Sequence, residues 1–216
     1  MNKENIKATD KESIKAFLEY NERLVDKKWI FNVMIANIII FYVGCFFSEY
    51  KIINIITCSI INIGMVCIYI YFPKKIEHNN KNILLFYGIY LWELSISCNY
   101  LAFHLLIIKF KYPLILFLFL LVGSIVIIIY TYFSIKYKIE KGKYINKKDI
   151  DSNIIFTIVL LGVGLSNIYL YLFHNEISLN TFLFILGVYV SIIGLFFASY
   201  IQIIMRYFYY KIYESL

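Results

Sequence analysis

Four polar residues lie at helical spacing in the stretch YLWELSISCNYLAFH, residues 90–104: Glu93, Ser97, Tyr100 and His104. Separations of four, three and four residues place them on one face of a helix, within about 60° of one another. A carboxyl and an imidazole can transfer protons, and a carboxyl inside a membrane often marks an ion pathway. Because the rest of the stretch is apolar enough to lie in lipid, Glu93 could do chemistry, move an ion or hold helices together.

Further polar residues are expected at the depth of Glu93. At a rise of 1.5 Å per residue, Glu93 and Asn62 lie about 15 Å from the inner ends of their spans, and Asn37 lies about 12 Å in. His104 lies about 16 Å farther out than Glu93, so these two side chains do not touch directly. The sequence therefore predicts an intramembrane polar site, which comprises Glu93, Asn37, Asn62, Ser97, Tyr100, His104 and Asn167.

Two interpretations of this polar layer remain open. A carboxylate at mid-membrane costs at least ~2.5 kcal/mol and usually faces a bundle interior or a water-filled cavity, which favours a functional site. Alternatively, a protonated Glu93 donates a hydrogen bond to Asn37 or Asn62 and joins helices, a contact worth ~0.6–2 kcal/mol. For the asparagines and serines we favour the structural interpretation. For Glu93 neither is preferred.

The scaffold that carries these residues is expected to be a helical membrane protein. Of 216 residues, 61% are hydrophobic, against about 45–50% in soluble domains. The excess is gathered into runs of about twenty residues, enough for a helix to cross the hydrocarbon layer. These runs are apolar all round, unlike the alternating strands of a barrel. We predict an all-α, polytopic bundle with six spans, at about 29–48, 52–72, 83–108, 114–135, 154–173 and 179–205.

Basic residues indicate the orientation of the spans. Of the 21 Lys and Arg residues, eighteen fall in the N-terminal segment, the 73–82 and 136–153 loops and the C-terminal tail, and three fall in the other loops. Basic loops stay cytoplasmic. We therefore expect a multi-pass protein of the cell membrane with both termini in the cytoplasm. The net charge of +7 then reflects topology and attraction to anionic lipids at the cytoplasmic face, and not a nucleic-acid partner.

The two ends of the chain are expected to differ from the 29–205 bundle. In residues 1–28, Ile14, Phe17, Leu18, Leu24 and Val25 recur on one helical face among basic residues, the pattern of an amphipathic helix on the cytoplasmic leaflet. Docking on a partner or against the 136–153 loop is the alternative. Residues 206–216 are expected to form a cytoplasmic tail.

Small residues line one face of the last span. Gly187, Ser191, Gly194 and Ala198 recur at spacings of four, three and four, and such a face lets helix backbones approach closely in lipid. It is expected to pack tightly, either within the monomer or in a homo-oligomer.

No enzyme motif is present in the sequence. HExxH, GxSxG, a phosphate-binding glycine loop and paired intramembrane aspartates are all absent, and the three histidines are scattered. We therefore expect no metal, no cofactor and no catalytic residues. All four cysteines fall inside spans. Cys45 and Cys58 are expected at similar depth on neighbouring helices, where a bridge is conceivable, although packing is the favoured interpretation.

Three functions are compatible with these patterns. The leading one is a non-catalytic membrane protein that binds a partner, of the immunity, defence or accessory-subunit type. Its support is the compact chain, the short outer loops and the small-residue face. The alternative is a small cation or proton channel or carrier centred on Glu93, and an intramembrane enzyme is third. The Ile-, Asn-, Lys- and Tyr-rich composition is typical of an AT-rich bacterial genome.

The orientation yields a first prediction. In a chain without its native cysteines, Asn146→Cys should react with a membrane-impermeant maleimide only after the cells are opened, because the 136–153 loop is expected inside. Glu49→Cys, in an outer turn, is the control and should react in intact cells. Labelling of position 146 in intact cells would contradict the assigned orientation.

Overall fold

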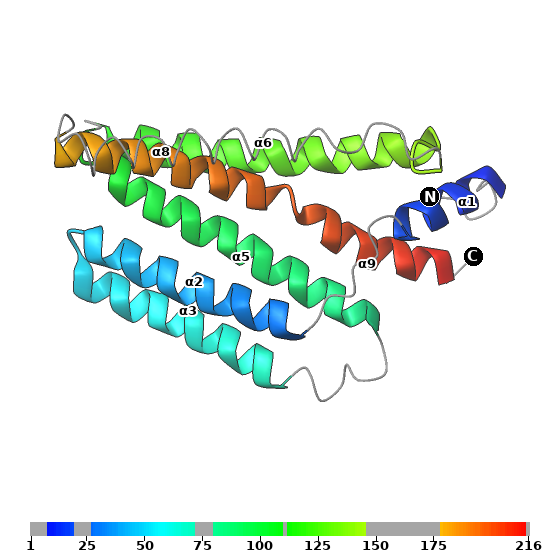
Figure 1. Ribbon diagram of the computed structural model, residues 1–216, viewed down its shortest axis with the longest axis horizontal. Coiled ribbons are helices and arrows are strands. Elements are labelled where there is room, and N and C mark those ends of the chain that lie inside the picture. The colour runs from blue at the N-terminus through cyan, green and yellow to red at the C-terminus, as the bar shows by residue number, and fades with distance from the viewer. Residues whose placement is uncertain (1–7, 20–26, 72–79, 110–111, 146–177, 215–216) are drawn as a thin grey trace.

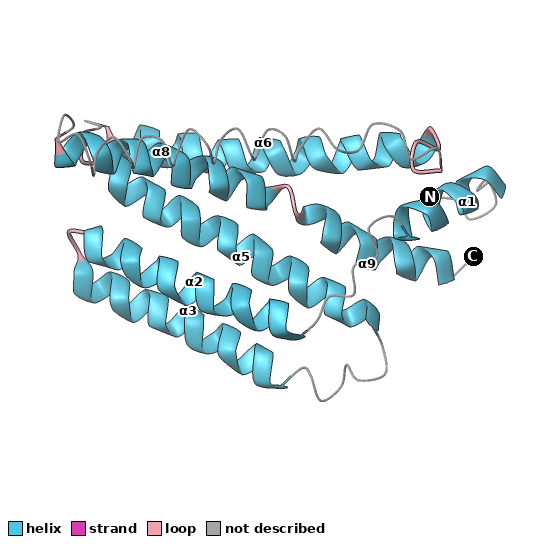
Figure 2. Cartoon of the chain, viewed as in Figure 1, coloured by secondary structure: helices cyan, strands magenta, loops and turns pink. Residues whose placement is uncertain are grey.

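The computed structural model describes residues 8–19, 27–71, 80–109, 112–145 and 178–214. Within these ranges the chain is helical, with short turns and no strand (Figure 2). The helices are α1 (Ala8–Glu19), α2 (Lys27–Phe47), α3 (Lys51–Tyr71), α5 (Asn80–Leu106), α6 (Pro113–Glu140), α8 (Leu179–Ala198) and α9 (Ile201–Glu214). The predicted span at 154–173, together with Asn167, Leu24 and Val25, lies outside the described residues.

Four of the described helices are long and apolar enough to cross a membrane: Lys28–Phe47, Lys51–Ile70, Pro113–Glu140 and Leu179–Glu214, the last of which combines α8 and α9. Their surfaces suit lipid, because α3 and α6 expose large apolar side chains along their length. These include Ile52, Ile53, Ile56, Ile60 and Ile63 on α3, and Leu114, Phe119, Val126, Tyr130 and Phe133 on α6. The described part of the chain is thus all-helical, and its long apolar helices are those of a membrane protein by length and composition.

α5 is the central helix of the bundle. It has 27 residues but interrupts its apolar sequence with Glu93, Asn99 and His104. α2 packs along one side of it and α8 and α9 along another (Figure 1). A helix covered by its neighbours does not need the all-round apolar surface of a lipid-facing helix. Burial among helices is therefore what lets α5 carry polar side chains.

Glycines allow close packing against α5. An added Cβ at Gly187 of α8 would lie 2.9 Å from Cβ of Leu105, and one at Gly194 would lie 2.8 Å from Oδ1 of Asn99. Ala198, on the same face, is fully buried. Ser191 is half-buried, and its hydroxyl donates to the carbonyl of Val188 in its own helix. The small-residue face thus packs within the monomer, one of the two arrangements expected from the sequence.

The C-terminal span bends after Ala198, where the sequence suggested one continuous helix. Tyr200 N–H donates to Phe197 O at 3.0 Å, and Ile203 N–H donates to Tyr200 O at 2.9 Å. Such bonds three residues apart tighten the backbone locally. As a result α9 leaves the line of α8 and passes between α5 and α1 (Figure 1).

α1 packs on the protein itself. Ile14, Phe17 and Leu18 are buried in a cluster with Ile135 and Ile139 of α6, Tyr144 and Met205 of α9. The Phe17 ring lies 5.0 Å from that of Tyr144, and the Arg206 guanidinium lies 5.5 Å above the Phe17 ring. The structure therefore packs the apolar face of α1 against α6, α9 and the turn after α6, which offer an apolar surface at the same end of the bundle. Its predicted position along the cytoplasmic leaflet stays a prediction.

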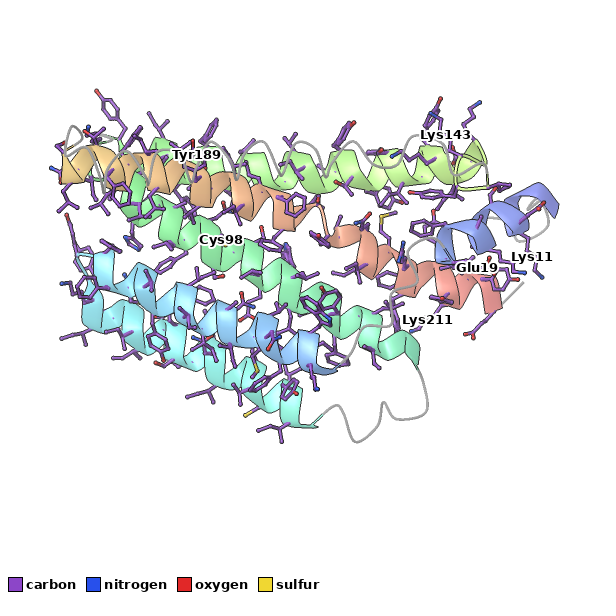
Figure 3. The ribbon with its side chains drawn as sticks, in the orientation of Figure 1. Lys11, Glu19, Cys98, Lys143, Tyr189 and Lys211 are labelled. Atoms are coloured by element: carbon purple, nitrogen blue, oxygen red, sulfur yellow. The ribbon has the colours of Figure 1, made fainter. Side chains whose placement is uncertain are left out.

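The charged side chains labelled in Figure 3 share that end of the molecule. Lys11 and Glu19 lie on α1, Lys143 follows α6, and Lys211 lies on α9. The turn between α2 and α3 lies at the opposite end (Figure 1).

The close packing of α8 on α5 can be tested by adding single methyl groups. Gly187→Ala should destabilise the protein by about 1–3 kcal/mol, because the new methyl overlaps Leu105 and Leu106. Gly64→Ala is the matched control, since nothing lies within 4 Å of its added Cβ. It should be neutral or stabilising by about 0.5–1 kcal/mol. Thermal unfolding in detergent measures both, and equal effects would contradict the described packing.

Candidate functional site

The side chain of Asn37 joins α2 to α5. Its Nδ2 donates to the carbonyl oxygen of Tyr90 and to Oε2 of Glu93, both at 3.1 Å. Its Oδ1 accepts a hydrogen bond from the hydroxyl of Ser97 at 3.1 Å. Asn37 is 1% exposed and Ser97 is fully buried. Because a primary amide has two N–H donors and a carbonyl acceptor, Asn37 uses both donors and its acceptor on one helix.

Tyr90 extends this connection to α3. It lies one turn before Glu93 on α5, is fully buried, and donates its phenolic hydrogen to the carbonyl oxygen of Met65 at 2.7 Å. The sequence analysis did not select Tyr90. The available signal was its position three residues before Glu93, which places both on one face of the helix.

Glu93 is buried and only partly satisfied. It is 7% exposed, and its Oε2 accepts the Asn37 bond. Its Oε1 is buried without a hydrogen-bond partner. The two ion pairs found in the described ranges, Lys15–Glu19 and Lys136–Glu140, lie on exposed surfaces elsewhere. A buried polar atom without a partner costs free energy, and a buried charge costs more. The second carboxylate oxygen is therefore the costlier half of this buried side chain.

Asn62 on α3 is the second incompletely satisfied residue. It is 6% exposed, and neither its Nδ2 nor its Oδ1 has a hydrogen-bond partner. Apart from Asn62, the only residue of α3 that is buried in the described structure is Cys58, one turn earlier. The two side chains thus share the face of α3 that turns inward, away from its row of exposed isoleucines.

The predicted polar stripe of α5 divides into two groups. Glu93 and Ser97 both contact Asn37, whereas Tyr100 and His104 belong to a separate cluster nearer the C-terminal end of α5. The Tyr100 ring packs 4.6 Å from the His104 ring and 5.8 Å from the Phe41 ring, and the Tyr100 hydroxyl lies 3.6 Å from Sγ of Cys45. Gly44 permits this contact, because an added Cβ there would lie 2.7 Å from the Tyr100 ring.

Other polar side chains of α5 form hydrogen bonds to α8 and α6. Ser95 donates to the carbonyl oxygen of Gly194 on α8 at 2.7 Å. Asn99 donates to the Ser124 hydroxyl on α6 at 3.0 Å. These contacts are ordinary hydrogen bonds between membrane helices. α5 thus separates a structural polar face toward α6 and α8 from the Glu93 face toward α2 and α3.

The described residues contain no group of three or more His, Cys, Asp or Glu side chains that could hold a metal ion. Comparisons of this chain with protein-family models, with curated proteins and with solved structures find no match.

The network around Asn37 makes a specific prediction about stability. Asn37→Ala removes the hydrogen bonds to Glu93, Ser97 and the Tyr90 carbonyl together and leaves Oε2 of Glu93 without its partner, whereas Ser97 keeps its bond to the Leu94 carbonyl. It should destabilise the protein by about 1–3 kcal/mol. Ser59→Ala, which removes an exposed hydrogen bond to Tyr42 between α2 and α3, is the control and should cost about 0.5 kcal/mol. Thermal unfolding compares them. Equal losses would show that the Asn37 network does not hold α2 on α5.

Proposed function

We propose that this protein moves protons across the membrane and that Glu93 is the residue that binds and releases them. The observation that carries the proposal is the buried Oε1 of Glu93, which has no hydrogen-bond partner in a site where Oε2 is firmly held. In this proposal the chain crosses the cell membrane six times, with both termini in the cytoplasm and α5 as the third span.

The position of Glu93 supports a transport role. An ionisable group buried among membrane helices is costly, and such groups are found in proton relays and ion pathways. A buried oxygen without a partner is not unique to Glu93, since Oδ1 of Asn99 also has none. Glu93 differs because its side chain is ionisable, and because Asn37 fixes one of its oxygens and so orients the other.

A proton fits the site better than a larger cation. A bound metal ion needs several oxygen ligands at once, as hard cations do in proteins, and the described residues offer one carboxyl here and no cluster of acidic groups. A proton needs a single acceptor. It also neutralises Glu93, which removes the cost of keeping a charge in a site without a counter-ion.

The small-residue face no longer favours the partner-binding hypothesis. Gly187 and Gly194 contact α5 within the same chain, so their spacing is explained without a second molecule. α1, the other candidate docking element, also has its apolar face covered. Partner binding becomes the better account only if the transport test fails.

Proton flux into proteoliposomes tests the proposal. Purified wild-type protein should acidify or alkalise the lumen in response to an imposed pH gradient or voltage, and Glu93→Gln should reduce that flux to the level of empty liposomes. Glu140→Gln is the matched control, since Glu140 is exposed and paired with Lys136, and it should keep wild-type flux.

Two results would reject transport through Glu93. One is wild-type flux in Glu93→Gln, and the other is wild-type protein that conducts no better than empty liposomes. Circular dichroism and a monodisperse elution profile establish that each variant is folded, so that lost flux is not lost structure.

A further inference from the structure

A second chemical feature lies near the end of the bundle opposite α1, where two thiols meet between α2 and α3. Sγ of Cys45 and Sγ of Cys58 are 3.4 Å apart. Cys45 is 1% exposed and Cys58 is 4% exposed, and both pack with Phe41 and Tyr100. The two sulfur atoms are thus at van der Waals contact, and a disulfide would bring them to about 2.05 Å.

The hairpin between α2 and α3 places these thiols together. α2 ends at Phe47 and α3 begins at Lys51, so the connection is short. Ser48 accepts hydrogen bonds from the backbone N–H of Tyr50 and from the Asn54 side chain, which hold the turn. Because Cys45 and Cys58 lie on the two helices that flank that turn, the hairpin itself brings them together.

The other two cysteines do not share this arrangement. Cys67 is exposed on α3, and Cys98 lies on α5 in the middle of the bundle (Figure 3). Cys98 contacts α8 at Gly194, where an added Cβ would lie 3.2 Å from the Cys98 Cβ. In the described residues, Cys45 and Cys58 are the thiols placed to react with each other.

We propose that Cys45 and Cys58 are a disulfide-forming pair that is oxidised from the outer face of the membrane by a disulfide-bearing oxidant. One cysteine attacks the oxidant's disulfide and forms a mixed disulfide while one thiol leaves. The other cysteine then attacks the mixed disulfide, which closes the Cys45–Cys58 bond and releases the second thiol. Two protein thiols and one disulfide become one protein disulfide and two thiols.

The compartment in this proposal depends on the topology proposed above, whereas the pairing depends only on the sulfur geometry. Outside the cytoplasm, disulfides persist because the environment is oxidising. Closure would fix the outer ends of α2 and α3 to each other. It would also change the chemistry of the Cys45 sulfur, which lies 3.6 Å from the Tyr100 hydroxyl, so Tyr100 on the α5 polar stripe would respond to the oxidation state.

The test counts free thiols in two variants of the chain, each of which keeps one pair of cysteines. Cys67→Ala/Cys98→Ala keeps Cys45 and Cys58, and Cys45→Ser/Cys58→Ser is the control that keeps Cys67 and Cys98. Membranes are treated with diamide, a small oxidant that accepts two hydrogens, then denatured in SDS with N-ethylmaleimide. Intact mass gives the number of thiols alkylated. A parallel sample, alkylated at lysis without diamide, reports the state in the cell.

The Cys45/Cys58 chain should lose both alkylated thiols after diamide, run as a monomer and recover both after reduction. The control chain should keep both. In the sample trapped at lysis, the Cys45/Cys58 chain should already lack free thiols. Full alkylation of Cys45 and Cys58 after diamide, or disulfide-linked dimers in place of the internal bond, would overturn the pairing. If Cys45 and Cys58 lose their thiols after diamide but are still alkylated in the sample trapped at lysis, oxidation from the outer face would be overturned. Neither result depends on whether Glu93→Gln alters flux.

Discussion

The bundle depends on one side-chain amide, that of Asn37, which makes three hydrogen bonds from α2 to α5. In lipid, apolar side chains gain nothing by leaving one apolar environment for another, so dispersion contacts and polar groups decide which helices associate. Asn37 supplies such a polar contact, and Tyr90 extends it to α3 through the Met65 carbonyl. The same amide fixes one oxygen of Glu93 and leaves the other without a partner. Helix association and the chemistry of the site therefore depend on the same group.

Close packing on the other side of α5 complements this network. Gly187 and Gly194 bring α8 into contact with α5, and Ser95 hydrogen-bonds the Gly194 carbonyl at the closest approach. Gly88 of α5 plays the corresponding role for α9, since an added Cβ there would lie 2.5 Å from Cγ1 of Ile204. α5 is thus held by a polar contact on one side and by backbone proximity on the other. Such a helix is well fixed, which is what an oriented carboxyl requires.

Sequence periodicity was informative about single helices and much less so about pairs of them. Hydropathy indicates apolar helices because length and composition are properties of one segment, and counting residues places Asn37 and Glu93 at similar depth. Neither hydropathy nor residue counting shows which helix faces contact each other. The spacing that puts Tyr100 and His104 on the stripe of Glu93 gives no sign that Tyr100 packs with Cys45 and Phe41. Likewise, a small-residue face has the same pattern whether it packs on α5 or on a second chain, and the apolar face of α1 suits lipid as well as Tyr144 and Met205. These choices are made by tertiary contacts.

The central claim is that Glu93 gains and loses a proton inside the bundle, and infrared difference spectroscopy measures this most directly. Spectra of the protein in lipid are recorded at stepped pH, and the carbonyl band of a protonated carboxyl is followed. Our account predicts a reversible band that grows as the pH falls, is absent in Glu93→Gln and is shifted in frequency when Asn37→Leu removes the hydrogen bond to Oε2. A difference spectrum that Glu93→Gln leaves unchanged would contradict the account, because Glu93 would then keep one protonation state throughout.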